Sequence, residues 1–229
     1  MNIRILHLIE GARQARGLTV IIDVFRAFSV EAYFLANGAN AIIPVGDTAI
    51  AYRLKAEHPE MILAGERHGK ILPGFDTGNS PTDLMNLDFS GKSVVHTTSA
   101  GTQGIANAIY ADEILGGSLV NARATAEYIR RSNAKEVSLV CMGLEALAPA
   151  DEDTLCANYI KSLLEGKELD VEAEVEKLKL TTGAKFFDPT QNDVFPRNDF
   201  FMCTDVDKFD FVMRLRTENG LQYMEKHRL

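Results

Sequence analysis

Short apolar runs alternate with helix-like segments through the first 165 residues of this 229-residue chain. The predicted strands cover 18–23, 41–45, 61–64, 93–96, 113–115 and 137–141, and the predicted helices cover 29–37, 47–57, 102–110, 121–132 and 152–165. Strands that alternate with helices of this length are typical of βαβ units. The expected fold is therefore α/β, with a mostly parallel sheet covered by helices on both faces in three layers.

The pattern changes after Gly166. A charged helix is predicted over 170–180, a loop over 181–196, and one or two extra C-terminal strands over 200–215. Proline cannot donate a hydrogen bond to a strand ladder. Pro44 therefore indicates that the 41–45 run is an edge strand or that the proline lies at a strand end. No stretch has the composition of a linker, so a single α/β domain over 1–229 is expected.

The composition excludes several classes of protein. A formal net charge of −8 argues against a nucleic-acid partner, because phosphate backbones require a basic face. No apolar stretch approaches the roughly 20 residues of a membrane span, and the N-terminal apolar run is too short for a signal peptide. The three cysteines form no C-x-x-C pair, which fits a reducing compartment. We expect a cytoplasmic protein that forms a homo-oligomer.

The segment 65–81 holds the densest set of polar groups in the chain. Its four glycines and two prolines exclude a helix or a long strand, and it follows the predicted strand 61–64. Loops longer than about 12–15 residues in a compact domain are usually functional or disordered. The groups able to bind an anion or a metal are Glu66, Arg67, Lys70, Asp76, Asn79 and Ser80. We interpret the segment as part of a site; the alternative is a solvated loop.

Asp23 ends a predicted buried strand, and Arg26 follows three residues later. In open parallel sheets, ligands bind where strand ends lead into helices. A carboxylate at such a position can act as a nucleophile or a metal ligand, and the arginine can reach an anion bound there. The alternative for Asp23 is a turn or N-cap carboxylate.

Two further strand-to-helix turns offer donors to an anion. The first contains Thr97, Thr98 and Thr102, and the second contains Ser118 and Asn121. Backbone N–H groups in such turns can face a phosphate or a carboxylate, although simple helix capping explains either turn equally well. Neither a G-x-x-x-x-G-K-[ST] loop nor a G-x-G-x-x-G fingerprint is present.

The predicted helix 152–165 begins with Glu152 and Asp153, which are either Mg²⁺ ligands or a charged cap. Cys141 ends a strand and is a possible nucleophile if a base or cation lowers its pKa. His68 and His96 have no visible partner in the sequence, and we expect neither to act as an acid or base.

In combination, these motifs resemble the 2-phosphosulfolactate phosphatase family. The resemblance covers nearly the whole chain in order and is carried by segments 22–27, 65–81, 97–102, 117–122, 141–143, 152–157 and 207–212. It implies a Mg²⁺-dependent hydrolase that converts 2-phospho-3-sulfolactate to 3-sulfolactate and phosphate, on a route toward coenzyme M. A small anionic phosphoester with phosphate, sulfonate and carboxylate groups suits a site built from cations and N–H-rich turns.

The resemblance also implies roles for individual residues. Asp23 or Glu66 is the expected nucleophile or base, assisted by Arg26. The expected Mg²⁺ ligands come from Asp23, Asp76, Glu152 and Asp153. The expected substrate-binding residues are Arg67, Lys70, Asn79, Thr97, Thr98, Thr102, Ser118 and Asn121.

Two departures from the family pattern leave alternatives open. The family tends to have Ala-Thr-Ser-Thr where this chain has Ala27-Phe-Ser-Val30, and Asn where it has Ala100. Each change removes a polar group near the expected site. The alternatives are a divergent member acting on another small phosphoester, a cysteine hydrolase with Asp23 as base and Cys141 as nucleophile, and a non-catalytic binder of anionic metabolites.

Overall fold

The computed structural model of the chain describes all residues from 1 to 229, and its ten strands form one sheet. The strands are β1 Asn2–His7, β2 Gly17–Ile22, β3 Ala41–Pro44, β4 Ile62–Arg67, β5 Lys70–Ile71, β6 Ser93–Thr97, β7 Ala111–Gly117, β8 Glu136–Cys141, β9 Phe211–Glu218 and β10 Leu221–Arg228. The α-helices are α1 Leu8–Gln14, α2 Ala27–Ala36, α3 Thr48–Glu57, α4 Gly101–Asn107, α5 Ala122–Ser132, α6 Asp151–Glu165, α7 Val171–Leu178 and α8 Arg197–Cys203. Short 3-10 helices are η1 Pro81–Leu84, η2 Leu119–Asn121, η3 Ala184–Phe187 and η4 Pro189–Gln191.

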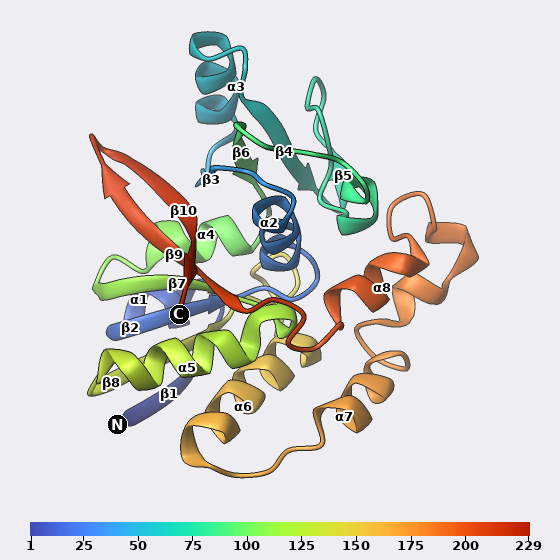
Figure 1. The fold of residues 1–229 in the computed structure, drawn as a ribbon. Coiled ribbons are helices and arrows are strands. Elements are labelled where there is room, and N and C mark those ends of the chain that lie inside the picture. The colour runs from blue at the N-terminus through green and yellow to red at the C-terminus, as the bar shows by residue number, and fades with distance from the viewer.

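The sheet consists of two parallel blocks joined by an antiparallel hairpin. The strand order is β1-β8-β2-β7-β9-β10-β3-β6-β4-β5. One block contains β1, β8, β2 and β7, and the other contains β3, β6 and β4. Figure 1 shows the hairpin β9–β10 between them. The hairpin pairs with β3 only at Met224 and Ile42, and both of these residues are buried. The two C-terminal strands therefore lie in the middle of the sheet, between β7 and β3.

Helices cover both faces, as a three-layer α/β/α fold requires. Figure 1 shows α5 and α6 on one face of the first block. Their apolar residues join those of β2 and β8 in one core cluster, whereas α1, α2 and α4 contribute to a second cluster. Helix α2 is buried over its whole length from Ala27 to Leu35, because it has apolar residues on every side.

The structure differs from the sequence-based expectation in four places. Strand β1 and helix α1 were not expected, and Phe200 lies in helix α8 rather than in a strand. Its ring packs in the core from a helical position, so burial outweighs the preference of phenylalanine for strands. Strand β4 continues to Arg67 and turns back as β5, because Gly69 adopts a φ of +75°. Pro44, by contrast, confirms one of its two expected placements, because it is the last residue of β3, which lies inside the sheet.

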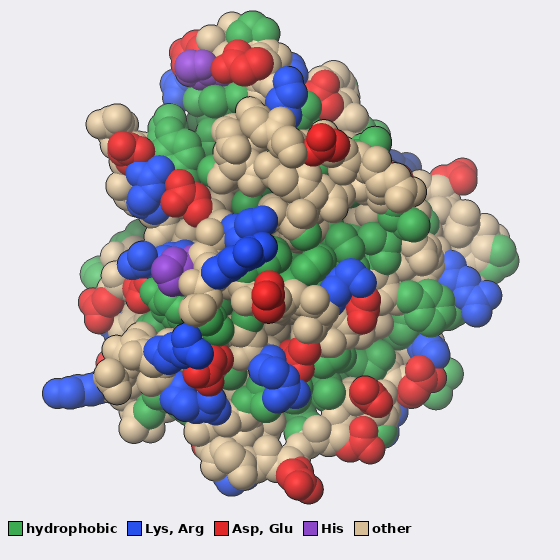
Figure 2. Space-filling model, in the orientation of Figure 1, with side chains coloured by type: hydrophobic (Ala, Val, Ile, Leu, Met, Phe, Trp, Pro, Cys, Tyr) green, Lys and Arg blue, Asp and Glu red, His purple; other side chains and the backbone are tan.

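Basic and acidic side chains are interspersed over the face of the molecule drawn in Figure 2. None of the helices combines the length and the apolar character needed to cross a membrane.

Candidate active site

A cavity of about 340 Å³ opens where strands of both parallel blocks end. Strands β2 and β8 contribute from one block and strands β4 and β6 from the other. The lining residues are Asp23, Phe25, Arg26, Glu66, His68, Gly69, Asn79, Thr98, Ser99, Ala100, Gly143, Leu144, Glu145, Glu152, Lys185 and Phe195. The carboxyl ends of parallel strands are the usual ligand site in sheets of this type.

Asp23 follows β2 and is 6 % exposed. Its Oδ1 accepts a hydrogen bond of 3.1 Å from the Ala27 backbone N–H at the start of α2. Burial raises the pKa of Asp23 to about 7, and the nearby charges of Glu66 and Glu152 act in the same direction. Asp23, Glu66 and Glu152 therefore line one cavity, together with Glu145, and the repulsion from Glu66 and Glu152 favours a proton or a nearby cation at Asp23.

Glu66, at the end of β4, has both of its carboxylate oxygens occupied. Oε2 accepts from the Gly69 N–H at 2.7 Å, and Oε1 accepts from the Ser99 N–H at 2.8 Å. The side chain thus joins the β4–β5 turn to the threonine-rich turn after β6.

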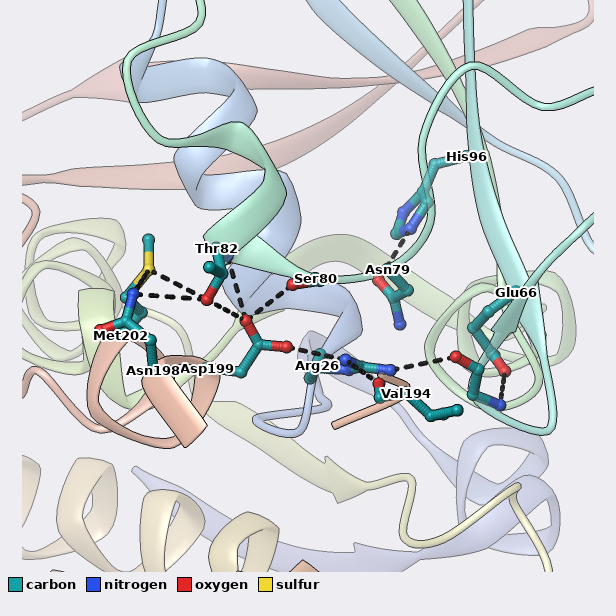
Figure 3. A network of polar contacts seen from close by, with 11 residues as sticks. Arg26, Glu66, Asn79, Ser80, Thr82, His96, Val194, Asn198, Asp199 and Met202 are labelled. Atoms are coloured by element: carbon teal, nitrogen blue, oxygen red, sulfur yellow. Dashed lines mark hydrogen bonds and ion pairs between the residues drawn. The ribbon is translucent and has the colours of Figure 1, made fainter. Parts of the chain in front are cut away.

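Arg26 lies at the centre of a buried polar network, drawn in Figure 3. Its Nη1 donates to Asp199 Oδ2 at 2.7 Å and to the Val194 carbonyl at 2.8 Å. Asp199 is fully buried, and its Oδ1 accepts from Ser80 Oγ, from the Thr82 N–H and from Thr82 Oγ1. Arg26 lines the cavity, but it is held there as one half of an ion pair.

Gly69 allows the β4–β5 turn to pack against the segment before α8. Its carbonyl accepts from Arg26 Nη2 at 3.3 Å. A Cβ atom at this position would lie 2.8 Å from both Phe195 Cζ and Val194 Cγ1. Only glycine combines the positive φ of this turn with so close an approach.

The two acidic residues at the start of α6 have different surroundings. Asp153 accepts from the Val24 N–H and the Gly143 N–H, each at 2.8 Å, so both of its oxygens are occupied. Burial raises the pKa of Asp153 well above its usual value. Glu152 lines the cavity, and its Oε2 is buried without a hydrogen-bond partner.

These environments decide which residues fit a metal ion. No group of three or more His, Cys, Asp or Glu side chains is close enough together to hold one. Asp23 and Glu152 line the cavity, and Glu152 Oε2 has no hydrogen-bond partner, whereas Asp153 lies outside the lining with both of its oxygens occupied. Mg²⁺ is typically held by one or two carboxylates and completes its shell with water and substrate phosphate. Asp23 and Glu152 therefore fit Mg²⁺, and Asp153 fits a structural role.

Asp76 does not reach the cavity. Its Oδ2 accepts from the Leu63 N–H at 2.8 Å and pairs with Lys55 at 3.0 Å. Two of the expected substrate-binding residues, Arg67 and Lys70, also lie outside the cavity lining. Arg67 donates to Thr97 Oγ1 at 2.9 Å. Lys70 is exposed on the outermost strand, β5.

Of the two donor turns, only the first borders the cavity. Thr98 lines it, and Thr102 supports the turn by accepting from the Thr98 N–H at 3.1 Å. In the second turn, Asn121 Oδ1 accepts from the Ser118 N–H at 3.0 Å. Both of those residues are fully buried and lie outside the cavity lining, so this turn is a helix cap. Asn79 lines the cavity, as its place in the long loop suggests.

Lys185 and Asp199 contribute to the site but were not identified from the sequence. Lys185 lines the cavity between two aromatic rings, with Nζ 5.1 Å from the centroid of Phe195 and 5.8 Å from that of Phe25. Burial lowers its pKa, and the charge of Glu152 opposes that effect. The loop length that identified 65–81 applies equally to the predicted loop 181–196, so this signal was available for Lys185. No pattern in the sequence indicated Asp199.

Cys141 is not placed as a nucleophile. It is fully buried, lies outside the cavity lining, and burial together with Asp153 raises the pKa of its thiol. The two departures from the family pattern lie in different surroundings. Phe28 is a fully buried core residue, whereas Ala100 borders the cavity.

Comparison with known proteins identifies the family of this chain. The sequence matches the 2-phosphosulpholactate phosphatase family over residues 3–218. The chain belongs to this family. A probable 2-phosphosulfolactate phosphatase of Bacillus subtilis is 32% identical over 212 residues, which cover 91% of each chain. One of Caldanaerobacter subterraneus is 32% identical over 221 residues, 88% of each chain. One of Caldicellulosiruptor saccharolyticus is 41% identical over 148 residues, 63% of this chain and 61% of the relative. The family is one of phosphoric monoester hydrolases.

The Arg26–Asp199 pair predicts a large effect on stability. Asp199→Asn leaves a buried guanidinium without its counter-charge, so the free energy of unfolding should fall by about 3–5 kcal/mol. Asp205→Asn removes the exposed partner of Lys208 and should cost less than about 1 kcal/mol. Urea unfolding measures both. Equal losses in the two variants would contradict the role given to the buried pair.

The raised pKa of Asp23 predicts how stability depends on pH without divalent cations. The unfolded group titrates near 3.8 and the folded group near 7, so folding takes up a proton between these values. The wild type should lose stability relative to Asp23→Asn as the pH rises from about 4 to about 7, by at most about 1.4 kcal/mol per pH unit. Thermal unfolding of both proteins in chelator measures the difference. A difference that is constant with pH would contradict the prediction.

Proposed function

We propose that this protein is a Mg²⁺-dependent phosphatase that hydrolyses 2-phospho-3-sulfolactate to 3-sulfolactate and phosphate, on a route toward coenzyme M. The proposal rests on one observation. A family of phosphatases matches residues 3–218, and strands of that region end at one cavity. The cavity is lined by carboxylates and also by groups that can donate hydrogen bonds to an anion. We also propose that the enzyme is a cytoplasmic homo-oligomer.

Asp23 suits the role of nucleophile or general base. It lines the cavity and accepts from the Ala27 N–H through Oδ1, whereas Glu66 is held through both of its oxygens by the N–H groups of Gly69 and Ser99. Without a metal ion, burial raises its pKa to about 7, where a general base is most effective, whereas as a Mg²⁺ ligand it would stay ionised. Mg²⁺ bound by Asp23 and Glu152 would offset the charge on the phosphoryl oxygens. Glu66 then has a positioning role, because it fixes the two turns that flank Asp23.

The anionic groups of the substrate require donors, and three residues of the lining supply them. Lys185 provides an unpaired cation, Asn79 an amide and Thr98 a hydroxyl. Arg26 adds positive charge from within its pair with Asp199. A low dielectric inside the cavity strengthens each of these contacts.

Phosphate release from 2-phosphosulfolactate and from an aryl phosphate, with Mg²⁺ or with chelator, tests the proposal. We expect Mg²⁺-dependent release from the sulfolactate ester, and no release in Asp23→Asn. Ala100 borders the cavity where the family tends to have Asn, so release only from another small phosphoester would identify a divergent member. If phosphate is released from none of the esters, the proposal that the protein is a phosphatase is contradicted.

The cavity lining favours Lys185 over Lys70 as the substrate-binding lysine, and a matched pair of variants tests this. Lys185→Met should lower kcat/KM about 10- to 100-fold, because a hydrogen bond from a charged donor contributes about 1.5–3 kcal/mol. Lys70→Met removes an exposed lysine and should leave kcat/KM within about twofold of the wild type. The reverse order of effects would show that the donor comes from β5 instead.

A further inference from the structure

A buried chain of three polar side chains leads from the core to the cavity. Glu31, on α2, and His96, on β6, are both fully buried, and Asn79 is 6 % exposed. Glu31 Oε1 lies 2.8 Å from His96 Nδ1, and His96 Nε2 lies 3.2 Å from Asn79 Oδ1. Figure 3 shows the second contact, with the amide nitrogen of Asn79 pointing away from His96. Glu31 is the only charged residue of an otherwise apolar or small-residue helix.

The contacts determine what the imidazole presents to Asn79. Glu31 Oε1 faces Nδ1, and Glu31 Oε2 has no hydrogen-bond partner. An amide oxygen can only accept, so the contact between His96 Nε2 and Asn79 Oδ1 is a hydrogen bond donated by Nε2–H.

The hydrogen bond to Oδ1 then fixes the orientation of the Asn79 amide. An amide can present either its oxygen or its NH₂ group, and only the NH₂ group can donate to an anion. With Oδ1 accepting from His96, the two N–H bonds are left for the cavity that Asn79 lines.

We propose that Glu31 and His96 are positioning residues, which hold Asn79 with its NH₂ group directed at the phosphoryl oxygens of the substrate. The inference rests on the proposed phosphatase function for its kinetic readout. Preorganised donors of this kind contribute mainly to kcat, because they are already aimed at the charge that develops in the transition state.

Two substitutions at His96 separate positioning from a merely structural role. The side chain of His96→Gln places an amide nitrogen near the position of Nε2 and can still donate to Asn79. The side chain of His96→Asn places its amide near Nδ1 and keeps the contact with Glu31 on α2. A structural tie between α2 and β6 therefore predicts that Gln is the more damaging substitution, whereas positioning of Asn79 predicts that Asn is.

We expect kcat to fall about 100-fold in Asn79→Ala and about 10-fold or more in His96→Asn. It should stay within about threefold of the wild type in His96→Gln, even if that variant has the lower melting temperature. In the Asn79→Ala background, His96→Asn should have less than about a twofold further effect. Equal loss of kcat in the two His96 variants, or a full further effect in that background, would overturn the inference.

Two measurements keep the inference distinct from the proposed function. Nitrogen-15 NMR of the histidine-labelled protein at pH 7 should show a hydrogen on Nε2 of His96, and its absence would overturn the inference. Titration with inorganic phosphate and Mg²⁺ should show weaker affinity in Asn79→Ala and His96→Asn than in His96→Gln. If the wild type hydrolyses no ester but shows this order of affinities, the phosphatase proposal fails and the positioning of Asn79 stands.

Discussion

The ion pair between Arg26 and Asp199 joins segments from distant parts of the chain, and the walls of the cavity depend on it. Both side chains are almost fully buried, and their nearest atoms are 2.7 Å apart. A buried pair offsets its desolvation cost only when its other polar atoms are also satisfied. Here Ser80 and Thr82 donate to Asp199, and the carbonyls of Val194 and Gly69 accept from Arg26. The pair thereby ties the long loop after β4, the segment before α8 and the β2–α2 turn around one space (Figure 3).

The topology of the sheet explains why that space can serve as a site. The C-terminal hairpin lies between the two parallel blocks and joins them into one sheet. Strands of both blocks end at the cavity. One block supplies Asp23, and the other supplies Glu66 and the threonine-rich turn. Burial raises the pKa of Asp23, and the charges of Glu66 and Glu152 act in the same direction, so the carboxylates favour a proton on Asp23. A divalent cation and an anionic substrate would satisfy the same carboxylates and donors without that proton.

The sequence predicted the layers of the fold, most of its strands and the strand end that carries Asp23. Periodicity also predicted helix α6. It could not tell which acidic residue of the first turn of α6 lines the cavity. Asp153 accepts hydrogen bonds from two backbone N–H groups, whereas Glu152 lines the cavity. Asp199 and the Glu31–His96 pair depend on contacts between segments far apart in the chain, and the predicted loop 181–196 was the only local signal for Lys185. A lone glutamate in the apolar stretch of α2 was the one local signal for that pair.

A crystal structure with Mg²⁺ and inorganic phosphate would test the central claim most directly, because it locates both groups at once. The account predicts a phosphate in the cavity between β2 and β4, within hydrogen-bond distance of the Asn79 amide nitrogen, and a metal ion on Asp23 and Glu152. A phosphate bound at Lys70 or at the 117–122 turn, or a metal ion on Asp76, would contradict it.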